Sequence, residues 1–124
     1  MKDGKNVILC VDDDKDILDT MKLILEANDY VFVSAPSAEE GLEVYKKHNP
    51  DLVIVDLMME EVDAGTSFVK ELKALGNKVP VYMLSSVGDE LNHSIDSSEL
   101  GLSGVFQKPI EADMLLKTIK TKLG

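Results

Sequence analysis

The chain has 124 residues, a length typical of one domain and too short for two. Its content of 44% hydrophobic and 29% charged residues excludes a disordered chain and a coiled-coil rod. The formal net charge of −10 opposes contact with a polyphosphate backbone, so direct DNA binding is not expected.

Five short segments rich in apolar and β-branched residues predict strands. Most are continuous apolar runs without alternation, which indicates strands that are covered on both faces. In chain order they are residues 6–11, 31–34, 52–55, 80–84 and 104–107.

Amphipathic segments between these runs predict helices. The first carries an apolar stripe at helical spacing, formed by Ile17, Leu18, Met21, Ile24 and Leu25. Further helices are expected to begin near Ser37, Gly65 and Glu111, the last ending at about Leu123. Residues 87–100 have the weakest pattern and are expected to form a short, exposed fourth helix. Strands that alternate with helices predict an α/β fold, with a doubly wound, mostly parallel sheet.

The chain shows no linker, repeat or low-complexity tract, so residues 1–124 are expected to form a single domain with no output domain in this chain. No segment approaches the roughly 20 apolar residues that span a bilayer, and the N-terminus does not resemble a secretory signal. The one cysteine, Cys10, lies in an apolar run and is expected to be a buried, inert thiol. We therefore expect a cytoplasmic protein without membrane contact.

Polar residues follow four of the predicted strands at the edge where parallel sheets bind ligands. They are Asp12, Asp13 and Asp14 after the first strand, Asp56 after the third, Ser85 after the fourth and Lys108 after the fifth. Each has an ordinary explanation by itself, since Asp13 or Asp14 could cap a helix, Ser85 could close a turn and Lys108 could be solvated. Together the carboxylates would repel one another unless a cation neutralised them, and oxygen ligands favour Mg²⁺.

The segments VILCVDDD, PDLVIVDLMM, VYMLSS and VFQKP resemble the motifs of the response-regulator receiver family of two-component signalling, in its chemotaxis-regulator-like form. The resemblance covers essentially the whole chain. It implies a flavodoxin-like (β/α)5 fold, in which a five-stranded parallel sheet has the strand order 2-1-3-4-5.

The resemblance also implies a role for each site residue. Asp56 would be the phosphoacceptor, Ser85 the switch hydroxyl and Lys108 the essential lysine, with a cis peptide bond before Pro109. The implied Mg²⁺ ligands are Asp12, Asp13, Asp56 and the main-chain carbonyl of Met58.

By the same resemblance, the chain would take a phosphoryl group from the phosphohistidine of a sensor histidine kinase or a histidine phosphotransfer protein. Phosphorylation would change the surface around the fourth helix, the fifth strand and the last helix, which a downstream protein would read. Such a chain is not an enzyme in the usual sense, because it catalyses only its own aspartyl phosphorylation and slow dephosphorylation. It would be a monomer or a weak dimer.

Three positions depart from the family pattern, in ways that bear on signalling. Glu60 and Ala64 replace the common proline and glycine in the segment after Asp56. Val105 replaces the aromatic residue often found three positions before the lysine, and the neighbouring Phe106 should point into the core. The output is therefore not expected to run through a rotating aromatic ring.

Two positions bear on how long a phosphorylated state lasts. Met58 and Val87 lie two residues after the expected phosphoacceptor and the switch hydroxyl, where they would flank the path of an attacking water. Neither apolar side chain can orient water by hydrogen bonding, so we expect slow decay of the phosphorylated state.

Two other functions are considered beside the phosphorylated receiver. One is a pseudo-receiver that binds partners without phosphorylation, which is less favoured because every position required by the chemistry is filled. The other is a metal-dependent phosphatase with an Asp-x-Asp motif, which Asp12 and Asp14 formally satisfy. That family usually has threonine or valine two positions after the second aspartate, where this chain has Asp16, and a larger chain with a cap. Identification of the phosphorylated residue distinguishes the three.

Overall fold

The computed structural model describes residues 4–56, 64–85, 103–107 and 110–123. Its strands are β1 (Val7–Val11), β2 (Val31–Ala35), β3 (Leu52–Asp56), β4 (Val81–Ser85) and β5 (Gly104–Gln107). Its helices are α1 (Lys15–Glu26), α2 (Ala38–His48), α3 (Ala64–Ala74) and α6 (Ala112–Leu123). The expected fourth helix at 87–100 lies outside the described residues. None of the described helices is long and apolar enough to span a membrane.

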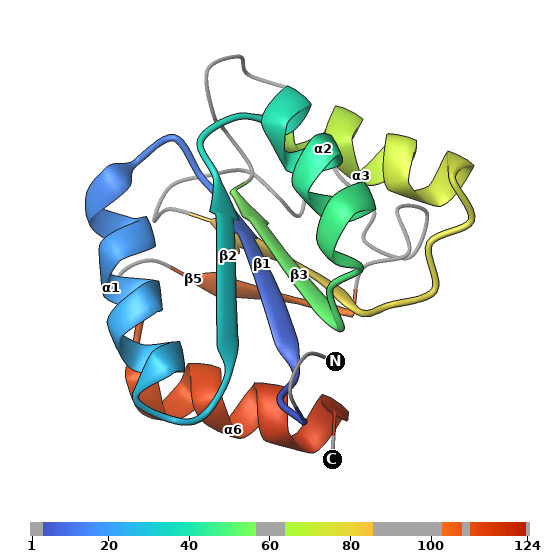
Figure 1. The fold of residues 1–124 in the computed structure, drawn as a ribbon. Coiled ribbons are helices and arrows are strands. Elements are labelled where there is room, and N and C mark those ends of the chain that lie inside the picture. Colours follow the sequence, from blue (N-terminus) through green and yellow to red (C-terminus); the bar gives the residue numbers. More distant parts are fainter. Residues whose placement is uncertain (1–3, 57–63, 86–102, 108–109, 124) are drawn as a thin grey trace.

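The five strands form one parallel sheet in the order β2-β1-β3-β4-β5 (Figure 1). Helices α1 and α6 cover one face of the sheet, and α2 and α3 cover the other. The predicted doubly wound α/β class is therefore confirmed, together with the strand order that the family resemblance implied.

The strands β2, β3 and β4 each end one residue later than the apolar runs predicted. The carbonyl of Ala35 still accepts a hydrogen bond from the N–H of Asp12 at 3.1 Å, and Asp56 is still paired with Leu84. In β3 and β4 the additional residue is polar, and a polar side chain does not interrupt backbone pairing, so hydropathy alone places these two ends too early. The site carboxylate of Asp56 is consequently held by regular sheet structure.

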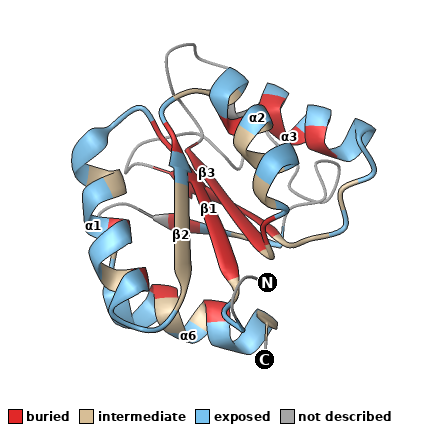
Figure 2. Cartoon of the chain, viewed as in Figure 1, coloured by how far each residue is buried: buried red, intermediate tan, exposed pale blue. Residues whose placement is uncertain are grey.

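Two hydrophobic layers enclose the sheet (Figure 2). Along β1, Ile8 and Cys10 pack toward α1 and α6, whereas Leu9 and Val11 pack toward α2 and α3. All five residues of β1 are buried, as the continuous apolar run predicted. This interior strand is therefore fixed from both sides, which gives the residues after Val11 a rigid support.

The fifth strand confirms the expected orientation of its aromatic residue. Phe106 is buried in the layer beneath α1 and α6, where its ring centroid lies 5.2 Å from that of Tyr82. Val105, on the opposite face, is 38% exposed.

Helices α2 and α6 begin directly after the residues near which the sequence placed their starts. The hydroxyl of Ser37 accepts a hydrogen bond from the N–H of Glu40 at 3.2 Å, so α2 begins where expected. Glu111 lies just before α6 and its carbonyl accepts from Leu115 at 3.0 Å.

A close approach at Gly41 sets the distance of α2 from the sheet. A Cβ atom there would lie 2.9 Å from Cγ2 of Val11 and 3.0 Å from Cε1 of Phe68. Only glycine therefore lets α2 lie this close to β1 and α3 without displacing their side chains.

Candidate functional site

The carboxyl ends of β1 and β3 bring the predicted carboxylates together. Val11 of β1 is paired with Val55 of β3, so the next residues, Asp12 and Asp56, lie side by side at the sheet edge. Oxygen atoms of Asp12, Asp13 and Asp56 all lie within 4.8 Å of one another. Among the described residues this is the single group of three potential metal-ligating side chains at such distances.

The burial of this cluster is uneven. Asp12 is 1% exposed and Asp56 is 4% exposed, whereas Asp13 is exposed. Burial of two carboxylates this close together costs free energy unless positive charge or hydrogen bonds offset it. The exposed Asp13 marks the solvent side, so a cation could reach the buried pair from that direction. An all-carboxylate set of this size fits a hard cation such as Mg²⁺.

The turn after β1 separates the cap of α1 from the carboxylate cluster, which the sequence left open. Asp14 is the N-cap of α1, and its Oδ1 accepts from the N–H of Asp16 at 2.9 Å. Asp12 Oδ1 accepts from the N–H of Asp14 at 2.9 Å, which holds the turn in shape. Asp13, between them, is the residue that joins the carboxylate cluster.

Ser85 ends β4, the strand next to β3. Because Asp56 is paired with Leu84, the following Ser85 lies at the same edge of the sheet as the carboxylates. Its side chain is buried, with 2% exposed. A buried hydroxyl at this edge is positioned by the sheet backbone on both sides.

Three predicted features lie outside the described residues: the carbonyl of Met58, the side chain of Lys108 and its bond to Pro109. The neighbouring strand position is described, since Gln107 is paired with Ser85. The described site thus consists of Asp12, Asp13, Asp56 and Ser85.

Cys10, two residues before Asp12 in the chain, confirms the expectation of a buried thiol. It is 1% exposed, and burial raises its pKa far above the ordinary value, with a smaller contribution from the carboxylate of Asp12. Burial therefore disfavours the thiolate, which is the form of cysteine that binds metal ions.

Sequence reasoning missed a carboxylate at the opposite edge of the sheet. Oδ2 of Asp51 accepts a hydrogen bond from the N–H of Val7 at 2.7 Å, across 44 positions in the chain. This contact fixes the start of β1 beside the start of β3. The position of Asp51 directly before a predicted strand was the available signal, but nothing in the sequence identified Val7 as its hydrogen-bond partner.

Comparison with known proteins agrees with this arrangement. The family model for the response regulator receiver domain matches residues 8–120. The chain is 34% identical to the chemotaxis protein CheY of Bacillus subtilis (strain 168) over 118 residues, which covers 94% of this chain and 97% of that protein. It is 33% identical to the transcriptional regulatory protein GlrR of Escherichia coli (strain K12), but spans only 26% of that longer protein.

Solved structures give the same result. A CheY-like response regulator receiver domain protein from Methanospirillum hungatei JF-1 superposes with a TM-score of 0.86 and 30% identity, over 97% of this chain and 94% of that one. The chemotaxis response regulator CheY4 of Vibrio cholerae gives a TM-score of 0.83 at 26% identity. With the family model matching most of its length, the chain belongs to the response-regulator receiver domain family of two-component systems.

Proposed function

We propose that this chain, as one receiver domain over residues 1–124, is a phosphoacceptor switch whose Asp56 is phosphorylated in a Mg²⁺-dependent reaction. The phosphoryl donor would be the phosphohistidine of a sensor histidine kinase or a histidine phosphotransfer protein, the partners with which receiver domains interact. One observation carries the proposal: oxygen atoms of Asp12, Asp13 and Asp56 lie within 4.8 Å of one another at the edge where ligands bind in such sheets.

The residues present fit a magnesium ion. Carboxylate oxygens of Asp12, Asp13 and Asp56 would hold it, with the carbonyl of Met58 as the fourth protein ligand that the family resemblance implies. The bound ion would neutralise charge on the carboxylates and on the oxygens of the transferring group.

Asp56 would act as the nucleophile. One of its carboxylate oxygens forms a bond to phosphorus as the bond from phosphorus to the donor histidine nitrogen breaks, and the histidine leaves. Because Asp56 is at the end of a regular strand and 4% exposed, its carboxylate has little freedom to turn away. Such a fixed position supports the in-line approach that phosphoryl transfer requires.

Ser85 and Lys108 would stabilise the phosphorylated form. The hydroxyl of Ser85, on the adjacent strand, would donate a hydrogen bond to a phosphoryl oxygen, and the ammonium group of Lys108 would offset its charge. Movement of Ser85 toward the phosphoryl group would be the first conformational step.

The output would be read at the surface around the fourth helix, β5 and α6. Val105 has no ring, and the neighbouring Phe106 is already buried against Tyr82, so a rotating aromatic side chain is not available at these two positions. Hydrogen exchange with and without BeF₃⁻ should change most from Ser85 to about Leu102. A response confined to α1 or α2 would contradict this route.

Mass spectrometry after treatment with acetyl phosphate tests the phosphoacceptor directly. The wild-type protein should gain one phosphoryl group with Mg²⁺ and none with a chelator, and Asp56→Asn should gain none. Modification of Asp12 would instead support the phosphatase hypothesis, although the side chain of Asp14, the second aspartate of that motif, already caps α1. No modification under any condition would support the pseudo-receiver.

A further inference from the structure

Strand β2 forms an edge of the sheet that lacks the usual protection against other chains. It stands at one end of the strand order, so only one of its sides is paired, with β1. Natural edge strands are often protected by charged residues, proline or a bulge. The five residues of β2, Val-Phe-Val-Ser-Ala, contain no charge and no proline, and all five pair with β1 in regular register. Within the strand itself, none of these protections is therefore present.

The hydrogen bonds to β1 show which backbone groups of β2 face outward. The N–H of Val31 donates to the carbonyl of Asn6 at 2.9 Å, so the odd-numbered residues of β2 bond to β1. Backbone groups alternate in direction along a strand, so the N–H and carbonyl groups of Phe32 and Ser34 point away from β1. In the part of the chain that the structure describes, no hydrogen bond reaches these four groups. They are therefore available to another strand.

The side chains of β2 also leave apolar surface at this edge. All residues of β1, β3 and β4 are buried, whereas Val31, Phe32 and Val33 are partly exposed and Ser34 is exposed (Figure 2). Phe32 packs toward α1 and α6, and Val33 packs toward α2 and α3. An added strand would cover apolar surface on both faces of the sheet, which favours binding.

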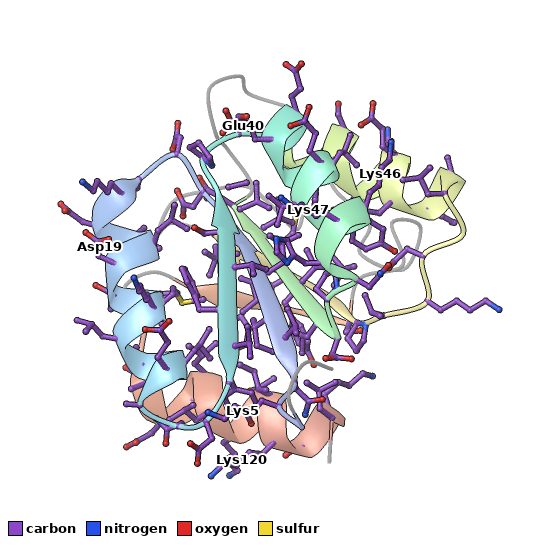
Figure 3. All side chains as sticks on the ribbon, viewed as in Figure 1. Lys5, Asp19, Glu40, Lys46, Lys47 and Lys120 are labelled. Carbon is purple, nitrogen blue, oxygen red and sulfur yellow. The ribbon has the colours of Figure 1, made fainter. Side chains whose placement is uncertain are left out.

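The helices beside this edge limit what can reach it. Figure 1 shows β2 from its open side, with α1 on one side and α2 on the other. Figure 3 shows Asp19 on the side of α1 that faces away from the sheet, so this charge does not cover β2. A second copy of this chain would have to bring its own α1 and α2 past these helices before its sheet could pair. A single extended segment carries no such helices and therefore fits this edge better.

We propose that β2 binds an extended segment of a partner protein, which adds a sixth strand to the sheet. The backbone of this segment accepts hydrogen bonds from the N–H groups of Phe32 and Ser34 and donates to their carbonyls. Apolar, β-branched residues at its centre lie beside Phe32 and Val33, on both faces of the sheet. The net charge of −10, with Glu39 and Glu40 exposed shortly after β2, favours basic residues at the ends of the segment.

Binding at β2 leaves the other edge of the sheet accessible. Strands β2 and β5 lie at opposite ends of the strand order, so the bound segment does not cover the surface around β5 and α6. The partner would therefore act as an anchor that holds the domain while a second protein reads that surface. Such binding is separate from phosphorylation and does not depend on it.

Hydrogen exchange measured by NMR tests this site on the unphosphorylated protein. The probe is the peptide Lys-Thr-Val-Ile-Val-Thr-Lys, acetylated and amidated at its ends. At a free peptide concentration of ten times the Kd, exchange at the amides of Phe32 and Ser34 should slow about tenfold, because about one molecule in eleven remains free. The amides of Val31 and Val33, which already bond to β1, should change less. The same peptide with glutamate in place of both lysines should bind more weakly.

Two variants and one modified peptide separate backbone pairing from other contacts. Ser34→Pro removes an outward N–H without removing a bond to β1, and it should raise the Kd by about tenfold. Ser34→Ala keeps this N–H and should bind as the wild-type protein does, and circular dichroism checks that both variants fold. N-methylation of the three central peptide residues blocks pairing by either side of the peptide. This peptide should not bind to the wild-type protein, a result that does not depend on the folding of any variant.

Several results would overturn the proposal. One is unchanged exchange at Phe32 and Ser34 with millimolar peptide, and another is equal Kd values for folded Ser34→Pro and Ser34→Ala. An N-methylated peptide or a glutamate peptide that binds as tightly as the original would do the same. Slower exchange at these two amides on raising the protein concentration without peptide would mean that a second copy occupies the edge, which would also overturn it.

Discussion

Replacement of Asp12 by asparagine removes one buried charge from the carboxylate cluster while keeping the shape of the side chain. The Oδ1 atom that accepts from the N–H of Asp14 at 2.9 Å remains available in asparagine. We therefore expect Asp12→Asn to raise the free energy of unfolding when no divalent metal is present. The same change should reduce the stabilisation that Mg²⁺ provides.

The size of the effect follows from the distance between the two buried carboxylates. Ligand oxygens of Asp12 and Asp56 lie within 4.8 Å of each other, so for two unit charges and an effective dielectric constant of about 20 their repulsion is about 3.5 kcal/mol or more. Both residues also make other interactions in the structure, which offset part of this repulsion. A net gain of about 1–2 kcal/mol remains, equivalent to a Tm increase of about 3–8 °C.

Urea unfolding with a chelator and with Mg²⁺ measures both parts of this prediction. The wild-type protein should gain about 2.7 kcal/mol at a Mg²⁺ concentration 100 times its Kd, and Asp12→Asn should gain less at the same concentration. Asp14→Asn is the matched control, because it removes the same charge from the same turn and asparagine caps helices as well as aspartate does.

Two outcomes would refute the reasoning. If Asp12→Asn is less stable than the wild-type protein in chelator, repulsion does not dominate the energetics of Asp12. If Mg²⁺ stabilises Asp12→Asn as much as it stabilises the wild-type protein and Asp14→Asn, then Asp12 is not a metal ligand.

Three further predictions concern packing, a long-range hydrogen bond and the lifetime of the signal. Gly41→Ala should lower the free energy of unfolding by about 1–3 kcal/mol, because its Cβ would overlap neighbouring side chains; unchanged urea unfolding would show that α2 can move away freely. Tyr45→Phe should cost about 1 kcal/mol by loss of the 2.6 Å hydrogen bond to Asn77, and a stability equal to that of the wild-type protein would contradict this value. Met58→Asn with Val87→Glu should speed loss of the phosphoryl group, followed by mass spectrometry; unchanged or slower decay would argue against the role given to these side chains.

Local patterns predicted the elements well because each buried strand is a continuous apolar run and each described helix has an apolar side. The strand order came from the family resemblance, since runs such as 6–11 and 52–55 do not identify their neighbours. Three strand ends were placed one residue early. Backbone pairing continues through the polar Asp56 and Ser85, and in β2 it continues through Ala35 after the polar Ser34.

The sequence indicated the site but could not assign all its parts. Asp13 and Asp14 both follow a strand and precede a helix, so either could serve as cap or ligand. The assignment depends on backbone geometry, because Asp14 has the extended conformation of an N-cap, with φ of −89°. The bond from Tyr45 to Asn77 joins residues 32 positions apart, and no local pattern predicts such a contact.

The single cysteine of this chain can serve as a natural reporter of opening. Cys10 lies on the interior strand β1 and is buried in the layer beneath α1 and α6, where burial raises the pKa of its thiol and disfavours the reactive thiolate. An alkylating reagent can therefore reach it only when the sheet opens, so the labelling rate measures the population of the open state. Because Asp12 follows the same strand, ions or phosphoryl groups that stabilise the sheet edge should slow this labelling, without any probe being introduced.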